Sequence, residues 1–285
     1  MRLMPNINFE RENCFEVFTQ FDHDEYVTGT PQLDGWIPTF APGDMQTGEQ
    51  ISPAVSGVLT QPNSQITITG TPVADQFHSF LRTHEEFIFS PNRPIRMSAL
   101  FPRAYADDNL DELNIFVGCM EDMDTATELQ DDGAGPRADS DMFGFFKVAQ
   151  ATGDYAGEVW NCVSGFGANQ QITELVYTNP LNLSGADQKV YDGDVYRNRT
   201  KLVAEWVPIN YVPGVAGAAP TLFDAEARFW INGVLCAKHQ MRGAYQLTSL
   251  ACEPMNFGYV SRTGLNQMII NHMEYLRCQQ IRYGE

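Results

Sequence analysis

Basic residues are scarce in this sequence. Lys and Arg together number 18, against 36 Asp and Glu, which gives a formal net charge of -18. A surface of that sign repels phosphate and anionic lipid head groups, so we expect neither nucleic-acid binding nor membrane-surface binding. The chain is also 43% hydrophobic. That content is too apolar for a disordered acidic tail, so the charge belongs to the exterior of a packed protein.

Long hydrophobic runs and paired cysteines are missing as well. No stretch reaches about 18 apolar residues, so no membrane-spanning helix is expected. Residues 1–6 lack the apolar core of a signal peptide, which predicts synthesis and assembly in a cytoplasm. The six cysteines form no CxxC pair, and Cys119 and Cys236 lie in apolar β-type patterns. Buried, reduced thiols are therefore favoured over a disulfide framework.

The sequence contains instead a succession of short β-prone segments. Residues 36–40 include a proline, which predicts a strand at the edge of a sheet. Residues 201–207 alternate apolar with polar side chains and should form a central strand. Asn232-Gly233 lies between two β-type runs and predicts a hairpin, because both residues tolerate the positive φ of a type I′ turn. These signals together predict an all-β sandwich.

Three further segments complete the expected organisation. Residues 1–14 are polar without a clear period and are interpreted as an extended N-terminal arm, followed by a single β-sandwich domain over residues 15–285. Residues 268–278 are interpreted as strand rather than helix. Residues 71–83, with apolar side chains at helical spacing, are expected to contain a short helix.

The order of these segments resembles the concanavalin A-like (LamG-like) jelly roll of structural and decoration proteins of tailed bacteriophages. The resemblance covers about residues 85–283, and residues 1–84 carry no motif that takes part in it. The matching segments are residues 94–101, 107–111, 114–119, 131–136 and 144–148, the strand that contains Trp206, the hairpin at residues 229–235 and the closing strand through Tyr275.

The resemblance implies a non-enzymatic viral structural protein on the exterior of a phage head. Its expected partners are the major capsid protein and neighbouring copies of itself, with a homotrimer favoured. The alternative on the same fold is a carbohydrate-binding, lectin-like module or a receptor-binding spike, because a fold does not fix a function. A hydrolase is disfavoured, since no pair of carboxylates has the spacing that sandwich glycosidases use on one strand.

Two weak binding signals stand apart from the resemblance. Asp131, Asp132, Asp139 and Asp141 lie in one Gly-rich segment, and calcium prefers several such oxygen ligands. These four residues are therefore the calcium candidates, although Asp side chains that stabilise turns explain the pattern more simply. Trp36 is the candidate for stacking on a sugar ring, because its segment adjoins a loop. The other three tryptophans lie in alternating segments and are expected in the core.

Overall fold

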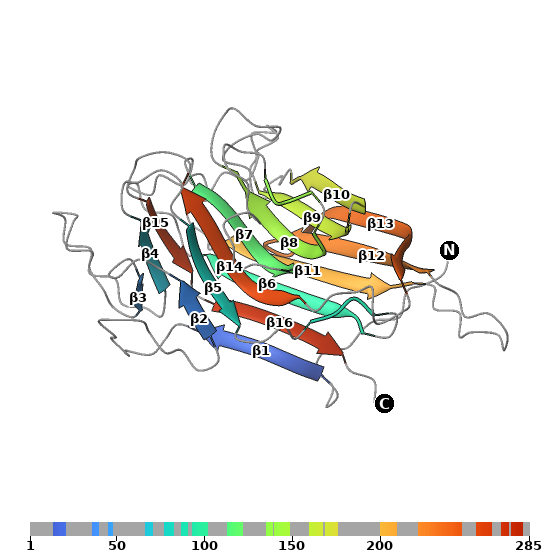
Figure 1. The fold of residues 1–285 in the computed structure, drawn as a ribbon, viewed down its shortest axis with the longest axis horizontal. Helices are drawn as coiled ribbons and strands as arrows, with labels where there is room; N and C mark the ends of the chain where they lie inside the picture. The colour runs from blue at the N-terminus through green and yellow to red at the C-terminus, as the bar shows by residue number, and fades with distance from the viewer. Residues whose placement is uncertain are drawn as a thin grey trace.

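The computed structural model describes the strands of the molecule and some of the turns between them. The described residues are 14–20, 36–39, 45–47, 66–70, 77–82, 87–90, 93–101, 113–121, 135–138, 140–148, 160–167, 169–175, 200–209, 222–246, 255–263, 269–273 and 275–281. All regular elements among them are β-strands (Figure 1). Within these ranges, no helix is long and apolar enough to span a membrane. The arm expected over residues 1–14 lies outside them, except Cys14, which begins the first strand.

Three antiparallel sheets contain the strands (Figure 1). The six-stranded sheet has the order β1 (Cys14–Gln20), β16 (Tyr275–Ile281), β6 (Ile95–Phe101), β11 (Thr200–Pro208), β12 (Leu222–Ile231) and β13 (Val234–Gln246). The seven-stranded sheet has the order β10 (Asn169–Glu174), β9 (Asn161–Phe166), β8 (Met142–Lys147), β7 (Leu113–Met120), β14 (Asn256–Thr263), β5 (Phe77–Arg82) and β2 (Trp36–Thr39). The three-stranded sheet has the order β15 (Ile269–Met273), β4 (Ile66–Gly70) and β3 (Met45–Thr47).

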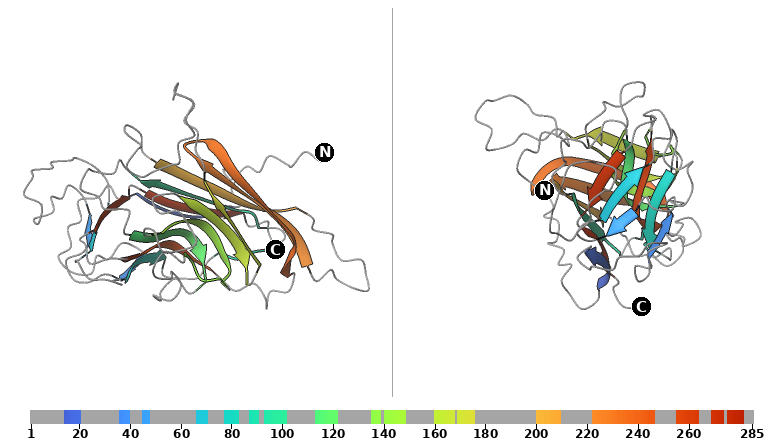
Figure 2. Two further views of the ribbon diagram at one scale, coloured as in Figure 1. Left: turned by 90° about the horizontal axis from the view of Figure 1, so that it is seen from above. Right: turned by 90° about the vertical axis from the view of Figure 1, so that its left-hand side faces the viewer.

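The two large sheets form the layers of a sandwich around one apolar core (Figure 2). Alternate residues of the described strands of these layers point into this core, as Ile95, Met97 and Ala99 of β6 do, because a β-strand has a period of two. Aromatic side chains fill much of it: the rings of Phe89 and Trp206 lie 4.7 Å apart, and Phe145 meets Phe229 from the opposite sheet at 5.5 Å. The predicted all-β sandwich is therefore confirmed.

Two cysteine thiols meet across this core. The Sγ atoms of Cys119 on β7 and Cys278 on β16 lie 3.6 Å apart, and both residues are buried. Burial raises the pKa of the Cys278 thiol well above its usual range, and the neighbouring Cys119 raises it further. Such thiols behave as small apolar side chains that join the two sheets by packing.

Several local predictions are confirmed and one is wrong. β2 is an edge strand, β11 is central, and the segment that closes the chain forms β15 and β16. The helix expected within residues 71–83 is instead strand β5, which pairs with β14 and β2. The apolar spacing in this short segment fits either structure, and pairing on both sides selects the strand.

The Asn232-Gly233 hairpin between β12 and β13 is confirmed. Both residues have positive φ, 49° for Asn232 and 82° for Gly233. The turn also binds the neighbouring strand, because the Asn232 Oδ1 atom accepts a hydrogen bond from the Lys201 backbone N–H at 2.8 Å. The Asn232 backbone N–H in turn donates to the Lys201 carbonyl oxygen at 2.9 Å.

Gly233→Ala is expected to lower the free energy of unfolding by about 1 kcal/mol, the cost of holding an L-residue in the left-handed region. A Cβ atom at this position meets no atom within 4 Å, so backbone conformation alone carries the cost. Urea denaturation of both proteins measures the difference. An unchanged transition would contradict the assigned turn.

Candidate functional surface

The outward side of the six-stranded sheet, here called the six-stranded face, is the exposed surface on which the described side chains form a continuous pattern. Strand pairing aligns the outward residues in rows that cross all six strands. We call two adjacent rows the charged row and the mixed row. The charged row consists of Glu16, Gln279, Arg96, Glu205, Arg228 and Lys238. The mixed row consists of Phe18, Arg277, Ser98, Val203, Trp230 and Leu235.

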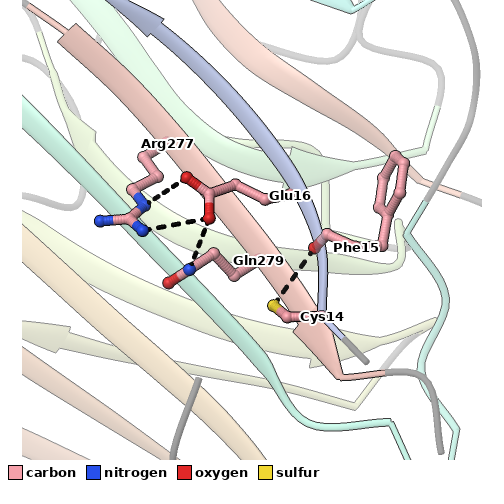
Figure 3. A network of polar contacts seen from close by, with 5 residues as sticks. All are labelled: Cys14, Phe15, Glu16, Arg277 and Gln279. Atoms are coloured by element: carbon pink, nitrogen blue, oxygen red, sulfur yellow. Dashed lines mark hydrogen bonds and ion pairs between the residues drawn. The ribbon is translucent and has the colours of Figure 1, made fainter. Parts of the chain in front are cut away.

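Glu16 organises the β1 end of this face (Figure 3). Its carboxylate forms an ion pair with the Arg277 guanidinium, with Nε 2.9 Å from Oε1, and accepts a hydrogen bond from Gln279 Nε2 at 2.9 Å. Arg277 also lies over the ring of Phe18, 5.9 Å from the ring centre, within the range of a cation–π contact. These contacts join β1 to β16 on the outward side and hold the side chains in fixed positions.

Ion pairs continue across the middle of the face. Arg96 Nε lies 3.6 Å from Glu205 Oε1, and Arg228 Nε donates to Glu226 Oε1 at 2.6 Å. Partial burial raises the pKa of the Glu205 carboxyl group, and the positive charges of Arg96 and Arg228 oppose that shift. The Arg96–Glu205 pair is partly exposed and contributes little to stability. Glu226 is only 6% exposed, so Arg228 is the partner that compensates its buried charge.

Apolar side chains are exposed beside these charges. Phe18 is 50% exposed and Leu235 is 42% exposed. Trp230 on β12, between Val203 of β11 and Leu235 of β13, is partly exposed. A strip that combines Phe, Trp and Arg has the composition of protein–protein interfaces, in which aromatic residues and Arg are enriched. The six-stranded face is therefore suited to binding a second macromolecule.

A buried polar cluster lies between β13 and the β9–β10 edge of the opposite sheet. His239 is 2% exposed. Its Nδ1 atom lies 2.8 Å from Ser164 Oγ, and its Nε2 atom lies 3.0 Å from Thr173 Oγ1 and 3.5 Å from Cys162 Sγ. The residue types match those of nucleophilic catalysis, but Ser164, Cys162 and His239 are all buried, so no substrate reaches them in this conformation. The cluster joins the sheets.

Burial sets the protonation of this cluster. It lowers the pKa of His239 from 6.5 to about 4, so the ring is neutral at pH 7. It also raises the pKa of the Cys162 thiol well above its usual range. A neutral histidine that contacts two hydroxyl groups satisfies its polar atoms without a buried charge. The inward position of His239 follows from the alternation of β13, whereas its partners on β9 and β10 are not evident from the sequence.

The outward side of the seven-stranded sheet differs from the six-stranded face, because the apolar side chains that the structure describes on its strands β7, β8, β9 and β14 are buried. Phe116, Met142, Phe146 and Val163 belong to a second apolar cluster there. Gly118 and Gly144 face each other on β7 and β8 beneath the Phe116 ring. This side therefore stabilises the fold and presents none of these rings to a ligand.

The structure describes only some of the residues that the sequence predicted to bind ligands. Asp131, Asp132 and Asp139 lie outside the described residues. Asp141 is 4% exposed, and its Oδ1 atom accepts a hydrogen bond from the Gly167 backbone N–H at 2.8 Å. It thereby stabilises the turn between β9 and β10. In the part of the chain that the structure describes, no three His, Cys, Asp or Glu side chains could together hold a metal ion. Calcium binding at the four aspartates stays a prediction.

The tryptophans follow the sequence prediction in part. Trp160 and Trp206 are core residues, as expected. Trp36 lies on edge strand β2, paired with Arg82 of β5, and the structure does not describe the position of its side chain. Trp230 was expected in the core and is instead partly exposed on the six-stranded face. The alternation of β12 gives the reason, since Phe229 and Ile231 occupy the inward positions on either side of it.

Comparison with known proteins shows the fold. No family model matches the sequence, and no curated protein matches it as a relative. Among solved structures, an endo-1,3-β-glucanase from Streptomyces sioyaensis has a TM-score of 0.50 and 11% identity, with 99% of this chain and 100% of that chain covered. The chain thus has the concanavalin A-like jelly-roll β-sandwich architecture that the sequence predicts.

Two lectins give similar matches. Peanut lectin has a TM-score of 0.49 and 10% identity, with 95% of this chain and 99% of the lectin covered. Lectin I from Ulex europaeus, solved with the methyl glycoside of α-L-fucose, has a TM-score of 0.46 and 8% identity. That match covers 94% of this chain and 98% of the lectin.

Proposed function

We propose that this protein is a non-enzymatic structural subunit that acts through protein–protein contacts on its six-stranded face. The observation that carries the proposal is the composition of the charged and mixed rows, in which Phe18, Trp230 and three arginines share one exposed surface. The reactive side chains Ser164, Cys162 and His239 are buried, which supports a role without catalysis.

The setting that we propose is the exterior of a tailed-phage capsid, with the major capsid protein as partner. The sequence resemblance is the basis of this proposal. The net charge of -18 is consistent with it, because such a surface repels a packaged genome. The homotrimer remains the oligomer that the resemblance favours. Assembly in the host cytoplasm is part of the same proposal.

Cosedimentation with a purified capsid shell tests this function. The wild-type chain should saturate the shell at a fixed ratio, and Trp230→Ser should weaken binding by at least about tenfold, as loss of a central aromatic contact does in other interfaces. Asn169→Ser is the control, because Asn169 is exposed at the start of β10 in the other sheet. Binding that Trp230→Ser leaves unchanged would refute the role of this face.

Carbohydrate binding is the second candidate. It is favoured by the half-exposed ring of Phe18 and the partly exposed Trp230 on a β-sheet surface, since aromatic rings stack on sugars. Calorimetric titration with a soluble β-1,3-glucan, chosen because an endo-1,3-β-glucanase shares the fold, measures this activity. Binding that Trp230→Ser abolishes, together with no binding to the shell, would select this candidate.

A further inference from the structure

The six-stranded face is complementary to itself. A two-fold axis that runs parallel to the strands, between β6 and β11, reverses the strand order of a facing copy. It places β1 opposite β13, β16 opposite β12, and β6 opposite β11 of that copy. Because the axis follows the strand direction, each row faces the same row of the other molecule. The geometry thus allows each side chain's counterpart to be read from the strand pairing.

The charged row is complementary under this operation. Glu16 comes opposite Lys238 of the second copy, and Arg96 comes opposite its Glu205. Gln279 comes opposite Arg228, but Gln279 is only 4% exposed and donates a hydrogen bond to Glu16, so this position adds no charge conflict and little contact. No two like charges of this row oppose each other, and each contact between copies occurs twice by symmetry.

The mixed row is also complementary to the same row of the second copy. Phe18 comes opposite Leu235 of the second copy, and both are exposed in the single chain. Arg277 comes opposite Trp230, which is the arrangement of a cation–π contact. Ser98 comes opposite Val203, which is 8% exposed, so the side chains at the centre of the row project little and let the two sheets approach.

Charge and area also favour a second copy of this chain. The two rows hold four basic and two acidic side chains, whereas the whole chain carries -18. Glu226, which pairs with Arg228, brings the face closer to neutral, so two copies can meet on it with less repulsion than acts between their strongly acidic other surfaces. Six strands at about 4.8 Å spacing, each about 23 Å long, give a flat footprint of roughly 650 Å². Side chains enlarge that surface toward the roughly 800 Å² per partner of a stable interface.

We propose that two copies of this protein form a face-to-face dimer through their six-stranded faces, with Glu16 opposite Lys238, Arg96 opposite Glu205, and Trp230 opposite Arg277 of the partner. The inference rests on the proposed function and names the partner on the same surface. Because each copy then covers the six-stranded face of the other, the dimer would attach to a shell through its remaining surface, and Trp230→Ser would weaken attachment by weakening the dimer. The dimer takes the place of the trimer favoured by the resemblance.

Two charge reversals test the dimer by analytical ultracentrifugation. The wild type should sediment as a dimer. Lys238→Glu puts a carboxylate opposite Glu16 of the other copy at both symmetry-related contacts. Glu16→Lys puts an ammonium group opposite Lys238 at the same two contacts. Each variant alone should dimerise at least about tenfold more weakly. An equimolar mixture should regain dimers, because each mixed pair restores both attractive contacts.

Lys201→Glu is the matched control. Lys201 lies on the same face in the next row, and the two-fold operation places Leu100 of the second copy opposite it. The same change of charge at this position should therefore affect dimerisation less than Lys238→Glu does. Circular dichroism verifies that each variant is folded, which matters for Glu16→Lys because it also removes the ion pair with Arg277.

The outcomes separate this inference from the proposed function. A wild-type monomer or trimer, or a mixture that shows no recovery, would overturn the dimer. If Trp230→Ser still weakened binding to the shell in that case, the proposed function would stand and the partner on this face would be the shell. A wild-type dimer that responds to the reversals but ignores the shell would support the dimer and contradict the capsid role.

Discussion

Gly144→Ala is expected to lower the free energy of unfolding by about 3 kcal/mol, or to prevent folding. A Cβ atom at this position would lie 2.4 Å from the Val117 carbonyl oxygen and 2.9 Å from the Gly118 Cα atom. Both are backbone atoms of the neighbouring strand, and the Phe116 ring closes the third side at 3.1 Å. The methyl group therefore forces β7 and β8 apart in the middle of a buried sheet. Urea denaturation and soluble yield measure the effect.

Gly165→Ala is the comparison for this result. Gly165 lies on the adjacent strand β9, and the atom nearest to its added Cβ, at 2.5 Å, is the Cγ atom of the Gln170 side chain. A side chain changes its rotamer more easily than a paired strand moves, although the change breaks the 2.7 Å hydrogen bond from Gln170 Nε2 to the Arg137 carbonyl oxygen. We therefore expect a loss of about 1 to 2 kcal/mol, smaller than that of Gly144→Ala. Equal losses for the two variants would show that the close approach of β7 and β8 is not what requires glycine.

Acidification is expected to remove about 3 kcal/mol of stability through His239 alone. The pKa of His239 is about 4 in the folded protein and 6.5 when the ring is in water. Because the folded value is the lower one, the neutral ring contributes fully above pH 6.5. The contribution is lost progressively as the pH falls toward about 4. At about 1.4 kcal/mol per pKa unit, that difference gives the expected size.

Comparison with His239→Gln isolates this contribution from the many carboxylates that titrate in the same range. The free energy of unfolding of both proteins should be measured by urea denaturation at intervals between pH 7 and pH 4. The advantage of the wild type should shrink by about 3 kcal/mol toward pH 4. Parallel pH profiles would show that His239 is exposed or charged in the folded state, contrary to its burial among Cys162, Ser164, Thr173 and Phe229.

Local signals predicted much of the fold. Alternation identified β11, turn chemistry identified the Asn232-Gly233 hairpin, and a proline placed β2 at an edge. Each of these depends on a few neighbouring residues. The expected helix within residues 71–83 failed because β5 is defined by its partners β14 and β2, which lie far away in the sequence. Apolar spacing alone did not distinguish the two structures.

The candidate surface depends almost wholly on such distant pairing. Glu16 and Arg277 are 261 positions apart, yet they lie on neighbouring strands. Taken singly, the residues of the charged row are ordinary polar positions in β-prone segments, and Gln279 lies one position beyond the closing strand expected over residues 268–278. Only the register of five strand pairs reveals that these positions form a row. The role of Asp141 was hidden for the same reason, since its partner Gly167 is on another strand connection.

The position of β16 between β1 and β6 has a consequence for biosynthesis. Residues 275–281 join an early strand to the rest of the six-stranded sheet, so this sheet is incomplete until they have left the ribosome. A chain that is still being translated, or that ends early, therefore lacks the continuous rows that cross the face. The surface through which we propose that the protein assembles would thus form only on chains synthesised through β16, which would keep unfinished copies out of the assembly.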